Sequence, residues 1–345
     1  MNPLALSVFI LSLAIGTTIT LSSYHWLLAW IGLEINTLAL IPIMTMNPHP
    51  RAIEAATKYF LTQATASALV IFSALINAWQ TGEWTITAIS NISSITISIA
   101  LMMKLGLAPL HFWMPEVLQG TPLISGLIMS TWQKIAPMSL IIQIAQLINL
   151  ELMIIVGLLS ILIGGWGGIN QTQLRKILAF SSIGHLGWMV VILKFDPQLT
   201  LLNFILYIIM TTTMFLSFMM TNSTKMQDIS TGFSKTPMMA TTSMLILLSL
   251  AGLPPLTGFI PKLLITTELI KQNAISLASL VMFISLLALF FYIRLTYIFT
   301  LTLPPNASNS TPLWYLKIKT NLTLAPLTST ALLIFPMSPT LLLML

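Results

Sequence analysis

Residues 104–116 read KLGLAPLHFWMPE, which places a glycine and two prolines in a long apolar stretch of the chain. Residues 252–262 read GLPPLTGFIPK and repeat this arrangement 146 positions later. Proline removes a backbone donor and clashes with the preceding helical turn, and glycine eases the bend. Each stretch therefore predicts a broken helix, with a simple packing kink as the alternative. The predicted breaks are at Gly106, Pro109, Gly252, Pro254 and Pro255.

The composition around these breaks is that of a membrane protein. Of the 345 residues, 56% are hydrophobic and 6% are charged, whereas charged residues make up about 25% of a soluble domain. A water-soluble enzyme and a soluble nucleic-acid-binding protein are therefore excluded, despite the net charge of +6. The chain has no cysteine, which excludes disulfides, thiolate metal sites, iron–sulfur ligation and a cysteine nucleophile.

The apolar stretches are long enough to cross a bilayer many times, since one helical crossing needs about 20 residues. We expect an all-α polytopic protein with about eleven transmembrane helices in a single membrane domain, residues 1–345. The longest loops are expected at about 80–90, 114–122, 222–237 and 300–320. The expected spans are 3–21, 26–46, 57–79, 92–112, 123–147, 153–170, 177–194, 199–221, 238–270, 275–299 and 321–343.

The two breaks fall in the fourth and the ninth of these spans. A five-helix unit that is repeated in tandem must be inverted in its second copy, because five is an odd number. Discontinuous helices in inverted repeats are typical of transporters, where they meet near the bilayer midplane. We therefore predict a first repeat at 1–148, a second, inverted repeat at 149–300, and a loop with a C-terminal transmembrane helix at 301–345.

Positive charges gather in the loops that follow even-numbered spans. The loops after odd-numbered spans carry only Lys194 and Lys271. The positive-inside rule then places the N-terminus and the even loops on the cytoplasm-like side of the membrane. An odd number of spans places the C-terminus on the other side. The positive residues of the even loops are Arg51, Arg175, Lys176, Lys225, Lys235, Lys317 and Lys319.

Four charged side chains lie well inside the expected spans, namely Glu34, Lys104, Lys134 and Lys262. A charge at the bilayer centre costs about 2.5–3.5 kcal/mol on insertion scales, so these residues must face the interior, form pairs or contact water. A lysine held between burial and a nearby carboxylate can change its protonation when that partner moves. The pattern favours a proton relay, and static ion pairs that hold helices together are the alternative.

Two histidines are further relay candidates. His185 lies in the middle of the seventh span and His111 lies at the first break. Imidazole titrates near neutral pH and can pass on protons, whereas a hydrogen-bonded core residue is the alternative for each. The chain has no Walker motif and no carboxylate cluster for a metal. The glycine run at 164–168 lacks the spacing of a nucleotide-binding loop, and we expect it to allow close helix contact instead.

Several motifs together resemble the antiporter-like membrane subunits of respiratory complex I. The resemblance runs nearly end to end, through AATKYFLTQA at 55–64, KLGLAPLHFWMPE at 104–116, WQKIAP at 132–137, NQTQLRKI at 170–177 and LPPLTGF at 253–259. Bacterial members of this family resemble a fourteen-helix plan, and this chain lacks the first three helices, as animal mitochondrial members do. The family shares ancestry with subunits of sodium/proton antiporters.

The resemblance assigns roles to the four charged residues. It pairs Glu34 with Lys104 on the first broken helix, makes Lys134 the connecting lysine and makes Lys262 the lysine on the exit side. It implies a proton-translocating core subunit of complex I in the mitochondrial inner membrane, with the N-terminus in the matrix and the C-terminus in the intermembrane space. The implied partners are neighbouring antiporter-like and small membrane-arm subunits, together with membrane lipids.

The same resemblance implies that the chain is a subunit of an NADH:ubiquinone reductase, yet binds no cofactor and performs no redox chemistry itself. NADH, FMN, iron–sulfur clusters and ubiquinone would be used in other subunits. Two other functions stay open from the residues alone. One is a cation/proton antiporter that acts by itself, and the other is a structural scaffold of the membrane arm without a proton path. No nucleic-acid partner is expected.

Overall fold

The computed structural model describes residues 3–46, 48–229, 237–301 and 323–337, which form helices joined by short loops, with no strand among them. The prediction of an all-α protein is therefore confirmed for this part of the chain. Contacts within the chain group the residues into two compact units, Met1–Ser160 and Ile161–Leu345. The helix α8 (Leu150–Ile169) begins in the first unit and ends in the second.

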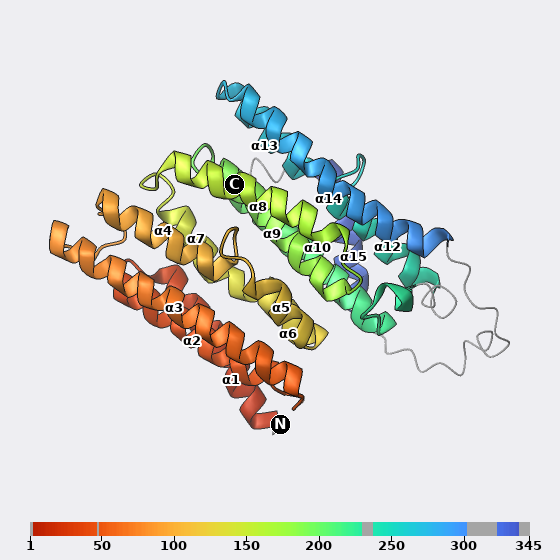
Figure 1. Ribbon diagram of the computed structural model, residues 1–345, viewed down its shortest axis with the longest axis horizontal. Coiled ribbons are helices and arrows are strands. Elements are labelled where there is room, and N and C mark those ends of the chain that lie inside the picture. The colour runs from red at the N-terminus through yellow and green to blue at the C-terminus, as the bar shows by residue number, and fades with distance from the viewer. Residues whose placement is uncertain (1–2, 47, 230–236, 302–322, 338–345) are drawn as a thin grey trace. The chain divides into compact units, whose positions relative to one another are not determined.

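The first unit is a set of neighbouring helices in chain order. Helix α1 packs against α2, α2 against α3 and α3 against α4, and the short helix α7 contacts α1, α2 and α4 (Figure 1). Helix α5 packs on α3, and α6 packs on α2 and α7. The bounds are α1 Pro3–Ser22, α2 Trp26–Met44, α3 Pro50–Thr81, α4 Asn91–Leu105, α5 Trp113–Gly120, α6 Leu123–Ser130 and α7 Trp132–Gln143.

The burial pattern of α1 and α2 is that of helices in lipid. On α1 the large apolar side chains of Leu4 and Val8 are exposed, while Thr17 and Thr20 are buried against α2. Small residues line this contact, since a Cβ added at Gly32 would lie 2.6 Å from the Thr20 Cγ2. Membrane helices associate through small and polar residues because lipid gives no hydrophobic drive between them.

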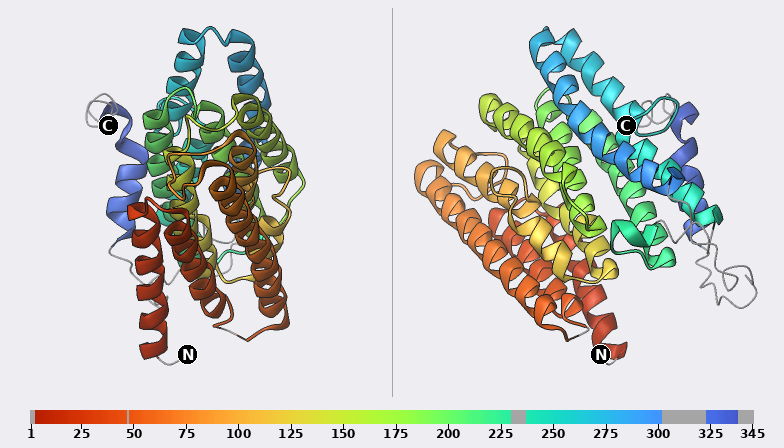
Figure 2. Two further views of the ribbon diagram at one scale, coloured as in Figure 1. Left: turned by 90° about the vertical axis from the view of Figure 1, so that its left-hand side faces the viewer. Right: turned by 45° about the vertical axis from the view of Figure 1, so that its right-hand side comes forward.

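The second unit is arranged around α10. This helix packs against α9, α12, α13 and α15, and α14 runs beside α12 and α13 (Figure 2). The bounds are α9 Leu174–Ile192, α10 Pro197–Thr221, α12 Pro237–Ala251, α13 Phe259–Lys271, α14 Ile275–Leu301, α15 Leu324–Leu333 and the 3₁₀ turn η3 Phe335–Met337.

The glycine run in α8 allows close helix contact, as predicted. A Cβ added at Gly164 would lie 2.6 Å from the backbone nitrogen of Gly184 on α9, and one at Gly168 would lie 2.9 Å from the Phe291 ring on α14. These distances leave no room for a larger side chain. The run therefore serves helix packing within the second unit.

Among the described residues, six helices are both long and apolar enough to cross a membrane, namely α1, α2, α3, α8, α10 and α14. The helices α4, α12 and α15 are apolar but shorter. Of the last predicted span, 321–343, the described residues form α15 and η3, and the rest lies outside the described residues.

Two expectations about the middle of the first unit were wrong. The predicted loop at 114–122 contains α5, whose first turn accommodates Pro115 because the first turn of a helix needs no intrahelical donor. The predicted fifth span is interrupted at Thr131, which separates α6 from α7. The Thr131 hydroxyl donates to the Leu127 carbonyl oxygen at 2.7 Å, and such a side-chain bond to the preceding turn competes with the regular helical pattern.

Candidate functional site

At the first break, between α4 and α5, backbone and side-chain donors bind the carbonyl groups at the C-terminal end of α4. Gly106 caps α4 in the left-handed region with φ of 76°, a conformation that costs other residues roughly 1–2 kcal/mol. The N–H groups of Gly106 and Leu107 both donate to the Met102 carbonyl oxygen at 3.0 Å. The Trp113 indole Nε1 donates to the Met103 carbonyl oxygen at 3.2 Å. The break thus supplies donors to carbonyls that a helix end leaves open.

Lys104 and Lys134 line one cavity within the first unit. Lys104 lies in the last turn of α4 and is 6% exposed, and Lys134 lies near the start of α7 and is 2% exposed. The Lys104 Nζ has no hydrogen-bond partner among the described residues. Two ammonium groups in one low-dielectric space repel each other, so a proton on one disfavours a proton on the other. The cavity therefore couples the charges of two predicted relay residues.

Glu34 is near these lysines without forming a salt bridge to Lys104. It lies on α2, is half-buried, and accepts a hydrogen bond at 3.3 Å from the Thr37 Oγ1. No ion pair in the described part of the chain joins Glu34 to Lys104. The pairing of Glu34 with Lys104 that the resemblance implies is therefore not a salt bridge here, and a coupling of the two charges stays a prediction.

Uncharged polar side chains complete the lining of this cavity, and reasoning from charge alone gave them no role. Gln63 Nε2 donates to the Lys104 carbonyl oxygen at 3.5 Å, and Gln133 Nε2 donates to the Asn36 carbonyl oxygen at 3.0 Å. The sequence feature that could have identified them is a polar residue within an apolar stretch, since such groups in membrane helices face protein or water. The residues concerned are Asn36, Thr37, Tyr59, Gln63 and Gln133.

The second break, between α12 and α13, is closed by a lysine. Gly252 takes the left-handed conformation with φ of 81°, and the Lys262 Nζ donates to the Ala251 carbonyl oxygen at 2.6 Å. The lysine side chain folds directly over the glycine, because a Cβ added at Gly252 would lie 2.8 Å from the Lys262 Nζ. Lys262 thus binds the C-terminal end of α12, where the helix dipole favours a cation.

His185 and Lys262 line a second cavity, which lies within the second unit. The Tyr292 hydroxyl lies 3.5 Å from the His185 Nε2 and lines the same cavity. His111 is buried at the first break, with its Nδ1 3.3 Å from the Pro109 carbonyl oxygen, and it does not line the cavity of Lys104. Across the described residues, no group of three or more His, Cys, Asp or Glu side chains is placed to hold a metal ion.

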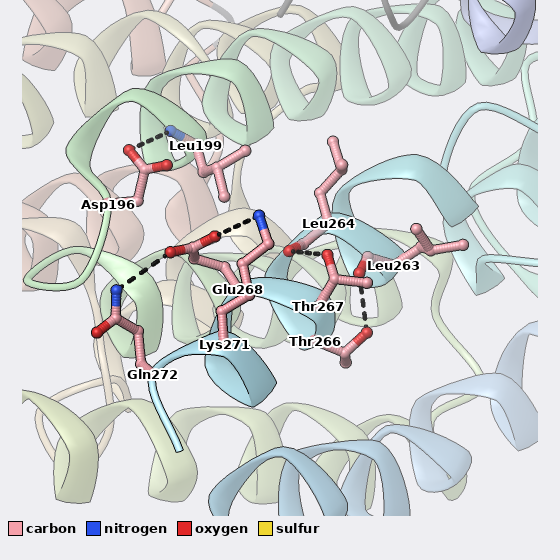
Figure 3. A network of polar contacts seen from close by, with 9 residues as sticks. All are labelled: Asp196, Leu199, Leu263, Leu264, Thr266, Thr267, Glu268, Lys271 and Gln272. Carbon is pink, nitrogen blue, oxygen red and sulfur yellow. Dashed lines mark hydrogen bonds and ion pairs between the residues drawn. The ribbon is translucent and has the colours of Figure 1, made fainter. Parts of the chain in front are cut away.

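Other charged groups lie outside both cavities and pair locally. Lys58 on α3 bridges Glu54 and, at 2.7 Å, Glu116 on α5. Figure 3 shows the C-terminal end of α13, where Glu268 accepts hydrogen bonds from Lys271 and Gln272. These groups are partly exposed and close to helix ends. They tie two helices together or close a helix terminus.

Comparison with known proteins defines the class. The family described as NADH:quinone oxidoreductase/Mrp antiporter, transmembrane, matches residues 23–288, and the NADH dehydrogenase subunit 2 C-terminus matches residues 289–342. A chain of respiratory complex I from Thermus thermophilus superposes with a TM-score of 0.82 at 25% identity, covering 96% of this chain and 79% of that chain. A chain of the Mrp complex from Dietzia gives 0.79 at 16% identity, covering 97% and 75%, which establishes the fold alone. The fold is that of an antiporter-like membrane protein.

Full-length relatives narrow the class further. NADH-ubiquinone oxidoreductase chain 2 of Aquarana catesbeiana is 71% identical over 100% of both chains, and that of Xenopus laevis is 60% identical over 91% of each. The chain belongs to the NADH-ubiquinone oxidoreductase chain 2 family. It is accordingly a multi-pass membrane protein, in agreement with its apolar helices.

Proposed function

We propose that the chain is a proton-translocating core membrane subunit of respiratory complex I in the mitochondrial inner membrane. Its family and its likeness to a complex I chain support this proposal. NADH oxidation and ubiquinone reduction then take place on partner subunits, which hold the cofactors. The chain acts as a subunit of a proton-translocating NADH:ubiquinone reductase, beside antiporter-like and small membrane-arm subunits.

The lysine cavity of the first unit carries the proposal. Lys104 and Lys134 line it together, and Glu34 on the neighbouring helix α2 forms no salt bridge to Lys104. When the quinone reaction in partner subunits draws Glu34 away, the proton affinity of Lys104 falls, because a nearby carboxylate favours the charged amine. The proton then moves toward Lys134. Because two ammonium groups in one cavity repel each other, Lys104 loses its charge as Lys134 gains one, and the two lysines are not charged together.

The second unit supplies the proposed exit. Lys262 receives the proton and passes it to the intermembrane-space side, with His185 as a further relay residue in the same cavity. Lys262 must release the Ala251 carbonyl to do so, since its ammonium is hydrogen-bonded there. His111 at the first break is a further candidate for proton uptake, supported by its burial beside the broken helix.

The proposed topology has eleven spans, with two inverted five-helix repeats at 1–148 and 149–300 and a C-terminal segment at 301–345. The matched glycine caps of the two breaks support the repeats. The matrix position of the N-terminus and the intermembrane-space position of the C-terminus are supported by the loop cations Arg51, Arg175, Lys176 and Lys225. The other cations of that argument, Lys235, Lys317 and Lys319, lie outside the described residues.

Replacement of Lys134 by Met in the assembled complex tests the proposal. Methionine fills a similar space without a charge, so we expect normal assembly and a lower ratio of protons pumped to electrons transferred. Lys271→Met is the matched control, because Lys271 is 72% exposed and pairs with Glu268 at a helix end. A normal ratio and normal assembly for Lys134→Met would instead favour a scaffold without a proton path.

A further inference from the structure

Two loop histidines bind the first turns of neighbouring membrane helices in the same way. His25 precedes α2, and its Nδ1 accepts a hydrogen bond from the Leu27 N–H at 3.3 Å. His49 precedes α3, and its Nδ1 accepts one from the Arg51 N–H at 3.2 Å. Both histidines have an extended backbone, with φ of −125° and −139°. Each is therefore the N-cap of its helix and binds an N–H group that a helix start leaves open.

Only a neutral imidazole can form this cap. A ring nitrogen accepts a hydrogen bond through its lone pair, whereas in imidazolium both nitrogens carry protons and donate. A proton on Nδ1 therefore breaks the bond from the backbone N–H and leaves two donors facing each other. The new charge also lies at a helix N-terminus, where the helix dipole disfavours a cation. Because free imidazole titrates at about pH 6.5, mild acid is enough to remove a cap of this kind.

The loop beside His25 holds its ring in place. The imidazole stacks on the Trp84 indole, with ring centroids 5.7 Å apart and planes inclined by 4°. The Trp26 N–H donates to the Trp84 carbonyl oxygen at 3.1 Å, so the same loop binds the start of α2. An indole face retains a cationic ring as well as a neutral one. The other titratable side chains in these two loops are Glu83 and Tyr24.

The charged groups near His49 are already paired with one another. Arg51 and Glu54 follow it on α3. Lys58 bridges Glu54 and, from α5, Glu116, at 2.7 Å each. Both histidines are exposed, so protons from solvent can reach both caps. The shared feature of the two sites is therefore the bond from a backbone N–H to an imidazole nitrogen.

The two caps lie on opposite sides of the membrane. Helix α2 has 19 residues and is apolar enough to span it. At 1.5 Å per residue its length is about 28 Å, close to the thickness of the hydrocarbon core. His25 lies at the start of α2, and His49 follows its end. Both capped helices, α2 and α3, contribute residues to the lining of the cavity of Lys104 and Lys134.

We propose that His25 and His49 are pH-dependent helix caps, which transmit the acidity on the two sides of the membrane to the helices that line the lysine cavity. Uptake of a proton forms an Nδ1–H bond, breaks the hydrogen bond from Leu27 or Arg51, and releases the first turn of α2 or α3. The regulation of proton transfer by these caps rests on the proposed function, whereas the release of the helix ends does not.

Hydrogen exchange of the intact complex, followed by mass spectrometry of its peptides, tests the caps without any substitution. After correction for intrinsic exchange, the first turns of α2 and α3 should lose protection several-fold between about pH 7.5 and about pH 5.5. Helix α10 is the internal control. It is capped by the Asp196 Oδ1, which accepts from the Gln198 and Leu199 N–H groups at 2.9 Å and 3.3 Å (Figure 3). Carboxylates ordinarily titrate near pH 4, so the protection of α10 should not change.

Equal changes at the starts of α2, α3 and α10 overturn the proposal, and so does the absence of a change at α2 and α3. His25→Asn and His49→Asn identify the groups responsible, because asparagine is a strong N-cap that does not titrate. In each variant the protection of its helix should become independent of pH. Coupled turnover of the double variant should also fall less in acid than that of the unaltered complex, and an equal fall overturns the regulatory role.

Lys134→Met, measured in parallel, separates this inference from the proposed function. A low proton-to-electron ratio for Lys134→Met, with exchange at α2 and α3 unaffected by pH, rejects the caps and leaves the relay standing. A normal ratio for Lys134→Met, with acid-sensitive exchange at α2 and α3, rejects the relay and leaves the caps.

Discussion

The two helix breaks have the same backbone design. Gly106 and Gly252 both take the left-handed conformation, with φ of 76° and 81°. In each break the next residue, Leu107 or Leu253, donates its N–H back to a carbonyl five residues earlier, at 3.0 Å and 3.3 Å. These bonds satisfy part of the helix end that a break leaves open.

The breaks differ in the side chain that binds the carbonyl groups at the helix end. This difference determines whether the lysine of each break is hydrogen-bonded to the helix end. At the first break the neutral Trp113 indole binds the Met103 carbonyl, which leaves Lys104 to the cavity. At the second break Lys262 itself binds the Ala251 carbonyl. The first break therefore presents an unbound charge, whereas the second presents a charge that must leave a helix terminus before it can move.

Of the substitutions that test this difference between the breaks, Gly252→Ala should have the largest effect on stability. The new Cβ would lie 2.8 Å from the Lys262 Nζ and Cδ, and the left-handed conformation adds roughly 1–2 kcal/mol. Displacing the lysine from the Ala251 carbonyl removes a charge-assisted hydrogen bond of about 1.5–3 kcal/mol. We expect a clear fall in the thermal-inactivation midpoint of the purified complex, with a loss of coupled proton transfer.

Gly106→Ala is the control for this prediction. It carries the same backbone penalty, but its Cβ would lie 3.2 Å from a ring carbon of Trp113 and would touch no charge. The midpoint should therefore fall less than for Gly252→Ala. Equal falls in the two variants would mean that the lysine adds nothing to the second break.

Removing the side chain that binds the helix end should cost more stability at the second break than at the first. Lys262→Met abolishes the ammonium bond to the Ala251 carbonyl, and we expect a loss of about 1.5–3 kcal/mol. Trp113→Phe keeps a ring but removes the N–H that binds the Met103 carbonyl, for which about 0.5–1.5 kcal/mol is expected. Thermal inactivation of both complexes measures the ranking. A larger loss for Trp113→Phe would show that ring packing, rather than the donor, closes the first break.

The breaks themselves were predictable from sequence, because a glycine and a proline act on the backbone wherever they stand. The closing side chains were not. Trp113 and Lys262 reach back to helix ends that precede them by about ten residues, and that reach depends on how the chain reverses between the two half-helices. The interruption at Thr131 was also missed, because the single Pro137 was read as part of a continuous span.

In the candidate site, too, some residues were predictable from the sequence and others were not. Charges such as Lys104 and Lys134 were predictable because placing them in lipid is expensive enough to require a reason. The amide of Asn36 was not, because an uncharged polar residue in a membrane helix is tolerated more readily. Whether such a residue faces a cavity depends on the rotation of its helix. The absence of a salt bridge between Glu34 and Lys104 likewise depends on distances that the sequence does not contain.

Lys104→Met should have the smallest effect on stability and separates the two lysines most sharply. Its ammonium is buried without a hydrogen-bond partner in the described structure, so removing it relieves an uncompensated charge. A buried charge without a partner is costly, so its replacement by an apolar group of similar size should be neutral or stabilising. The loss of a cation at the end of α4 opposes this by only about 0.3–1 kcal/mol.

We therefore expect the thermal-inactivation midpoint of Lys104→Met to stay at or above that of the unaltered complex, while the proton-to-electron ratio falls. Lys262→Met should lower both quantities, because Lys262 binds the end of α12 and also belongs to the proposed proton path. A midpoint for Lys104→Met as low as that for Lys262→Met would mean that Lys104 is bound in the assembled complex. The two breaks would then present their lysines in the same way, and an unbound charge at the first break could not be the reason for the proposed proton transfer.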